Sequence, residues 1–390
     1  MRVLRYLYPI VLFFFAWSVC VAMYSLIEEE TATLLGYPRE YYMVPLLSIN
    51  ILTVLITLHY YSRCHGQTAL VLIWLILIVL IYPIVSTFKA REVIEITLWP
   101  TSYLASYSLI RSKPNYLKAL RWLFLIIYIL GLFYFVRGKI LQEGLSSLGL
   151  ESASNAVFCV LTVMPFLLLF RSKPIVLISL VVTLAAVVFS NKRSALIIYA
   201  VALIPTIWSY LSKRKSSLKR IVLSVLIIGG LLILFNYLVS NYLEGRIFER
   251  FESISDDQGS GRFPAWSLLL SKIFSSDPFS FILGHGHYAV SKTIDLTAAH
   301  NDFLEVLYDY GLLLFIVYLL LHLRIIQRTI ALYKNKSPLF TSYFFSTVVF
   351  IIMSWVSILI VQQRYMIYFA IYWGMIEALI DRGIDYRDLK

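Results

Sequence analysis

Apolar runs recur along the whole chain, and they constrain its fold more than any other feature of the sequence. A helix needs roughly 20 apolar residues to cross the ~30 Å hydrocarbon layer of a bilayer, where every backbone polar group must be satisfied internally. The runs have about this length. We therefore predict membrane-spanning helices over residues 7–27, 43–61, 68–88, 94–110, 119–136, 156–170, 175–190, 194–211, 221–239, 311–325, 339–362 and 365–380.

The composition supports this interpretation. Of the 390 residues, 60% are apolar and only 14% are charged, and the mean hydropathy is +0.79. A soluble domain has about 45–50% apolar and about 25% charged residues. Basic Arg2 and Arg5 ahead of the first run could belong to a signal peptide, but the later runs favour a retained span. The prediction is an all-α polytopic membrane protein with about 12 spans, forming one domain over residues 1–390.

The distribution of charge predicts the side of the membrane that each loop faces. If the N-terminus is cytoplasmic and the sides alternate, 21 of the 34 Lys and Arg residues lie inside and 18 of the 22 Asp and Glu residues lie outside. This agrees with the positive-inside rule and places both termini in the cytoplasm. The basic residues responsible for the net charge of +12 then lie mostly on the cytoplasmic side, facing anionic lipid. No nucleic-acid partner is needed to explain the net charge.

One outer loop, residues 240–310, is far longer than an ordinary connection and is the expected place of the chemistry. Its pattern predicts an amphipathic helix over 246–254, a helix from Pro264 that ends before Ser275-Ser-Asp-Pro278, and a tight turn at Gly284-His-Gly-His287. A last helix is expected over 298–310, running into the tenth span.

Two arginines are candidates for binding an anion at the outer face. Arg193 lies in the short turn Ser190-Asn-Lys-Arg-Ser194 between two spans, where a positive charge opposes the topology bias. The alternative is an arginine that snorkels to a lipid headgroup. Arg262 follows Gly259-Ser-Gly261, where glycines allow close backbone approach and the next helix start favours anions.

Two further arginines, Arg246 and Arg250, share a helix face at i, i+4 spacing. They are candidates for substrate binding, but Glu249 and Glu252 could pair with them in a solvated surface network, and we favour that interpretation.

His300 is the candidate general base, at the predicted first turn of a helix. Its neighbours Asn301, Asp302 and Glu305 could orient the imidazole or bind sugar hydroxyls. A structural histidine is the alternative. Zinc bound by His285, His287, His300 and Asp302 is also conceivable, but the spacing is not that of a metal motif, and we expect neither metal nor cofactor.

Four motifs in order, Asn191-Lys-Arg-Ser194, Gly261-Arg-Phe-Pro-Ala-Trp266, Pro278-Phe-Ser-Phe-Ile-Leu-Gly-His-Gly286 and Ala299-His-Asn-Asp-Phe-Leu-Glu-Val-Leu-Tyr-Asp-Tyr-Gly311, give the chain a family resemblance. With the large outer loop between two late spans, this segment resembles the O-antigen polymerase and O-antigen ligase family of bacterial membrane glycosyltransferases. The first half of the chain has no motif that we can match.

The resemblance implies a metal-independent glycosyltransferase of the bacterial inner membrane, whose periplasmic site takes its donor glycan from undecaprenyl pyrophosphate. By the same resemblance, Arg193 and Arg262 hold the donor pyrophosphate and His300 activates the acceptor hydroxyl. A chain-length regulator protein is an implied partner. The absence of a plausible covalent nucleophile predicts inversion at the anomeric carbon.

Three functions stay open at this point. A polymerase transfers the glycan chain to another lipid-linked repeat unit. We favour it because the Ile-, Phe-, Tyr- and Lys-rich composition resembles that of polymerases from divergent sugar-specific gene clusters. A ligase transfers the chain to the lipid A core. A flippase for lipid-linked oligosaccharides would also have about twelve spans, but it would need no loop of this length and should show paired repeats, which we do not find.

Overall fold

The computed structural model describes residues 1–28, 33–34, 37–38, 40–62, 66–86, 89–145, 155–211, 229–230, 233, 237, 262–294, 298–357, 359–360 and 362–388. Apart from one antiparallel ribbon, β1 (Thr33–Leu34) with β2 (Tyr37–Pro38), the regular structure of these residues is helical. The helices are α1 (Arg2–Glu28), α2 (Glu40–Ile56), η1 (Leu58–Tyr60), α3 (Gly66–Val85), α4 (Ala90–Ser112), α5 (Tyr116–Leu145), α6 (Val157–Leu167), α7 (Lys173–Phe189), α8 (Arg193–Leu211), α11 (Arg262–Phe274), α12 (Pro278–Leu283), α13 (Ala289–Thr293), α14 (Asp302–Lys334), α15 (Phe340–Val356), α16 (Gln363–Asp381) and η3 (Tyr386–Asp388).

The predicted spans agree with these helices where the two can be compared. Eleven of the twelve overlap a helix, and the ninth, 221–239, lies largely outside the described residues. Among the described helices, four are long and apolar enough to cross a membrane: Arg2–Val21 in α1, Gly66–Val85, Tyr116–Gly138 in α5 and Asp302–Lys334. This supports a membrane protein, while the total of twelve spans stays a prediction.

The outward face of α5 shows what surrounds the bundle. Trp122, Ile126, Ile129, Phe133 and Val136 lie on one face of this helix at alternating spacings of four and three residues, and each is 47–56% exposed. A continuous apolar stripe of this kind is not tolerated on a soluble monomer. It suits contact with lipid tails.

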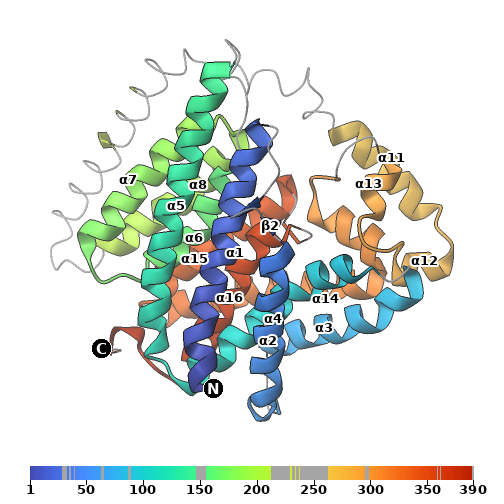
Figure 1. Ribbon diagram of the computed structural model, residues 1–390, viewed down its shortest axis with the longest axis horizontal. Coiled ribbons are helices and arrows are strands. Elements are labelled where there is room, and N and C mark those ends of the chain that lie inside the picture. The colour runs from blue at the N-terminus through green and yellow to red at the C-terminus, as the bar shows by residue number, and fades with distance from the viewer. Residues whose placement is uncertain are drawn as a thin grey trace.

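The centre of the bundle is formed by α4 and α16, which pack along much of their length. Gly374 of α16 makes this possible, because a β-carbon there would lie 2.3 Å from the carbonyl oxygen of Tyr103 and from the hydroxyl oxygen of Ser106. Small residues at helix contacts are a common solution in membranes, where packing replaces the hydrophobic effect. In Figure 1, α5 to α8 lie on one side of this centre and α11 to α13 on the other.

In the outer loop, the predicted limits of two helices can be compared with the structure. The helix expected from Pro264 is α11, which begins two residues earlier and ends at Phe274, directly before Ser275 as predicted. The helix expected over 298–310 begins only at Asp302, because Asn301 caps it, accepting hydrogen bonds from the amides of Phe303 and Leu304. The expected helix at 246–254 lies outside the described residues.

Candidate functional site

His300 stands in a turn that is held on both sides. Its backbone φ is +52°, in the left-handed region. On one side, the indole of Trp266 donates to the carbonyl of Ala299 at 2.6 Å. On the other, Asn301 caps α14, and its side-chain amide donates to the carbonyl of Trp355 at 3.5 Å. A non-glycine residue in this conformation persists only where the surroundings enforce it, and such residues gather at functional sites.

The surroundings of His300 keep its imidazole neutral. Burial is the largest cause, followed by the positive charges of Arg262 and Lys192, and together they lower the pKa of His300 to about 4. A histidine with this pKa is uncharged at neutral pH and can accept a proton. The two cations also show that the Asn191-Lys-Arg-Ser194 turn and the start of α11 lie near His300, although the three segments are far apart in the sequence.

Arg193 is the first residue of α8, directly after a tight turn. The turn is closed by Ser190, whose hydroxyl donates to the carbonyl of Val187 at 2.7 Å and accepts from the amide of Lys192 at 3.2 Å. Asn191 is buried and has a φ of +53°. Because Lys192 lies near His300, this turn faces the candidate site rather than lipid alone, which favours the anion-binding interpretation of Arg193 over snorkelling.

Arg262 is the first residue of α11, and its guanidinium donates to the carbonyl of Val356 at 2.8 Å. This bond ties α11 to the end of α15. Arg262 therefore supports the local structure in addition to placing positive charge near His300.

Asp302 and Glu305 are buried and serve the backbone around the site. One oxygen of Asp302 accepts from the amides of Leu359 at 2.8 Å and Ile360 at 3.2 Å, and the other accepts from the hydroxyl of Tyr318 at 2.9 Å. Glu305 accepts from the amide of Ala299 at 2.8 Å. These contacts hold the turns that flank His300, so of the two roles left open by the sequence they favour orienting His300 over binding a ligand directly.

The glycines of the last two motifs let two backbones approach each other. A β-carbon on Gly284 would lie 2.3 Å from the carbonyl oxygen of Asp309, and one on Gly311 would lie 2.4 Å from the amide nitrogen of Gly284. Both have positive φ, and the Gly311 backbone interrupts α14 with a kink. The contact fixes the Gly284-His-Gly286 turn against the outer part of α14.

Arg246 and Arg250 lie outside the described residues. His285 stacks on Tyr308 with ring centroids 4.1 Å apart, whereas His287 is buried beside Glu95 of α4. Among the residues that the structure describes, no group of three or more His, Cys, Asp and Glu side chains is placed to hold a metal.

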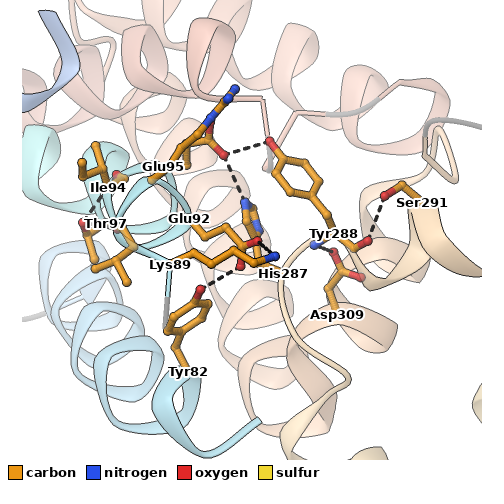
Figure 2. Close-up of polar contacts among 12 residues, drawn as sticks. Tyr82, Lys89, Glu92, Ile94, Glu95, Thr97, His287, Tyr288, Ser291 and Asp309 are labelled. Atoms are coloured by element: carbon orange, nitrogen blue, oxygen red, sulfur yellow. Dashed lines mark hydrogen bonds and ion pairs between the residues drawn. The ribbon is translucent and has the colours of Figure 1, made fainter. Parts of the chain in front are cut away.

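A second polar cluster, missed by the sequence analysis, joins the first half of the chain to the outer loop. Figure 2 shows Tyr288 donating to Glu95 at 3.1 Å and His287 lying 3.5 Å from the same oxygen. The amide of Tyr288 donates to Asp309 at 3.0 Å. The sequence offered one signal for Glu95: it is an acidic residue at the predicted outer end of an apolar span. Lys192, also missed, is adjacent to Arg193.

Comparison with known proteins agrees with the resemblance of the four motifs. Residues 178–319 match the family model described as O-antigen ligase, a segment that contains Arg193, Arg262 and His300. No curated protein matches the chain. The match confirms the O-antigen polymerase and ligase family as the relatives of this segment, and it does not extend to α1–α6 or to α15 and α16.

Proposed function

We propose that this chain, which carries the domain of the O-antigen polymerase and ligase family over residues 178–319, is an O-antigen polymerase. It would transfer a glycan from undecaprenyl pyrophosphate to a lipid-linked repeat unit at the periplasmic face of the inner membrane. The observation that carries the proposal is the neutral, half-buried His300 beside the charges of Arg262 and Lys192.

The chemistry needs few groups. His300 accepts the proton of the acceptor hydroxyl while that oxygen attacks the anomeric carbon of the donor sugar, and the bond from this carbon to the pyrophosphate oxygen breaks. Undecaprenyl pyrophosphate leaves with the electron pair, and the charge that develops on it is stabilised by fixed cations. Arg193, Arg262 and Lys192 are the cations that we assign to this role. A single displacement inverts the anomeric centre.

Binding of the donor should also prepare the base. The cations near His300 disfavour its protonated form while the site holds no anion. A bound pyrophosphate offsets their charge, so the pKa of His300 rises toward the range in which an imidazole is an efficient base at neutral pH. Proton removal is then coupled to the presence of the donor.

The second candidate function is ligation to the lipid A core, which the match to the family model supports as well as it supports polymerisation. Our preference for a polymerase rests on composition. Both reactions use the same donor and the same chemistry, and they differ in the acceptor.

The test is transfer by the purified protein in detergent. The donor is undecaprenyl-pyrophosphate-linked repeat unit, offered with either further repeat unit or lipid A core, and the products are separated by length. A ladder on the undecaprenyl lipid indicates a polymerase, and glycan on lipid A core indicates a ligase. Absence of any new linkage with either acceptor would contradict a transferase and leave a flippase, which cannot act in detergent.

A further inference from the structure

A cavity outside the His300 site lies between the first half of the chain and the start of α16. Its enclosed space is about 40 Å³, well below the ~300–1,000 Å³ of sites that enclose a whole small molecule, so a ligand larger than a few waters is seated mainly at its open mouth. By the predicted topology, it opens at the periplasmic face. Its lining is contributed by α1, α2, α4, the Tyr288 turn and the start of α16, through Phe15, Val19, Met43, Glu95, Tyr288, Gln362, Gln363 and Arg364.

Glu95 presents a fixed carboxylate to this cavity. Its side chain is buried, and its oxygens accept from Arg91 at 3.1 Å and from the hydroxyl of Tyr288 at 3.1 Å. These contacts hold the carboxylate in one orientation. A carboxylate held in this way is a strong acceptor for hydroxyl groups, because hydrogen bonds to an ionised partner are roughly twice as strong as neutral ones.

Gln363 gives the second observation. It is only 7% exposed, it lines the same cavity, and its side-chain oxygen has no hydrogen-bond partner among the described residues. A buried acceptor without a partner loses its bonds to water and gains none in return, so such a group in a native protein calls for an explanation. A donor from an occupant of the cavity supplies one.

The chemistry of the lining narrows the occupant. The formal charges of Glu95 and Arg364 balance, and the other polar groups are two amides and a phenol. This set fits a neutral ligand with many hydroxyls better than a pyrophosphate, which needs several cations. Phe15, Val19 and Met43 add an apolar wall of the kind that packs on the C–H face of a sugar ring.

The cavity is also connected to His300. Arg262, near His300, bonds to Val356 at the end of α15, and Asp302 bonds to Leu359 and Ile360, shortly before α16 begins with Gln363. A sugar seated in the cavity therefore lies close in the chain to residues that are anchored beside His300.

We propose that this cavity is a subsite for one neutral sugar residue of the glycan substrate, bound by Glu95 and Gln363. The assignment rests on the proposed function. The subsite would involve the first half of the chain in substrate recognition. The family match does not cover that half.

The binding test uses phosphate-free oligosaccharide, released by mild acid from the lipid-linked repeat unit of the host cell. Saturation-transfer NMR should detect its binding to the wild-type protein in detergent. Gln363→Leu, which keeps the volume of the side chain, and Glu95→Gln should each weaken binding about 3- to 10-fold, the effect of losing one hydrogen bond. Gln327→Leu, on an exposed face of α14, is the matched control and should bind like the wild type.

Steady-state transfer assays then identify the source of the sugar. A raised KM for the acceptor places an acceptor sugar in the cavity, and a raised KM for the donor places a donor sugar there, with kcat little changed in both cases. Thermal unfolding checks that each variant is folded. If Gln363→Leu is not folded, Glu95→Gln alone provides the test. Wild-type binding in both variants, or no binding of the oligosaccharide to the wild type, overturns the subsite. Absence of transfer with intact binding contradicts the proposed function instead.

Discussion

His300 combines a strained backbone with a half-buried ring, and among the described residues no negative charge raises its pKa. Left-handed conformations of non-glycine residues cost about 1–3 kcal/mol and persist where function requires the side chain. Burial would lower the pKa of a packed histidine as well. The proposed role as general base uses both properties, because the imidazole must stay neutral and point at one place.

Replacement of His300 should separate the two roles. His300→Ala and His300→Gln should reduce transfer about 10²–10⁴-fold, the usual effect of removing a general base. His300→Gly should be as inactive but no less stable to heat than His300→Ala, because glycine adopts the left-handed region without strain. Rates and melting temperatures of the three variants provide the measurement. Near-normal transfer by His300→Gln would show that another group is the base.

The pH dependence of the reaction follows from the same surroundings. Only the neutral imidazole accepts a proton, so activity is lost as the pH falls through the pKa of His300. For kcat/KM, which reports the free enzyme, the acid limb should lie near pH 4, well below the ~6.5 of an unperturbed histidine. For kcat, which reports the donor complex, the limb should lie at higher pH.

A variant of Lys192 checks the cause of this shift. Lys192→Met removes one of the two positive charges that lower the pKa of His300, so the kcat/KM limb should move to higher pH. Burial remains in the variant and should keep the limb below ~6.5. An unchanged limb would mean that Lys192 is not near the base.

Arg193 is the cleaner of the two arginines to test, because Arg262 also bonds to the end of α15. Arg193→Ala should lower kcat about 10²–10³-fold, as the loss of one preorganised donor does elsewhere. Arg193→Lys should restore little, since an ammonium cannot grip two phosphate oxygens in a fixed fork. Arg137→Ala, an exposed arginine on α5, is the control. Wild-type product lengths from Arg193→Ala would rule out the pyrophosphate role.

At the scale of elements, α14 is the helix on which the site depends. Its capped start presents His300, its outer turns carry Asp302 and Glu305, and its kink at Gly311 lets the Gly284 turn pack against its backbone. The Gly284 turn is therefore coupled to α14 through close backbone contact, while the side chains of Arg262 and Trp266 couple α11 to the end of α15 and to the turn before α14.

Glycine substitutions test that contact. Gly284→Ala and Gly311→Ala should both lower the melting temperature and the activity, because the new β-carbon meets backbone atoms at 2.3 and 2.4 Å, and φ is positive at both positions. Gly131→Ala in α5 is matched to them, since nothing lies within 4 Å of its β-carbon. That change should stabilise its helix by up to about 1 kcal/mol. Equal melting temperatures for all three variants would contradict the close approach.

For the whole molecule, the prediction concerns orientation in the membrane. Single cysteines at Gln142 and Gln258 should react in whole cells with a reagent that enters the periplasm but does not cross the inner membrane, and cysteines at Ser217 and Asn335 should not. The background needs a variant that lacks Cys20, Cys64 and Cys159. Labelling of the second pair alone would invert the topology and place His300 in the cytoplasm.

What the sequence by itself determined is local. Apolar runs and the stop before Pro278 depend on residues within a few positions of each other, so the helices and most of their limits could be predicted from the pattern, whereas the start of α14 at Asp302 could not. The motifs also identified His300, Arg193 and Arg262 as candidates, but not which of these residues lie close together.

Tertiary packing alone decided which of these groups meet. Lys192, Arg262 and His300 lie near one another because the turn after α7, the start of α11 and the start of α14 converge, and no periodicity encodes that. Asp302 and Glu305, which the sequence offered as sugar ligands, are turned toward backbone amides. Glu95 and Gln363, at the starts of two apolar helices, share a cavity only because α4 packs against α16. The pattern of a helix fixes which face is apolar, but the partner of that face depends on the shapes of residues hundreds of positions away.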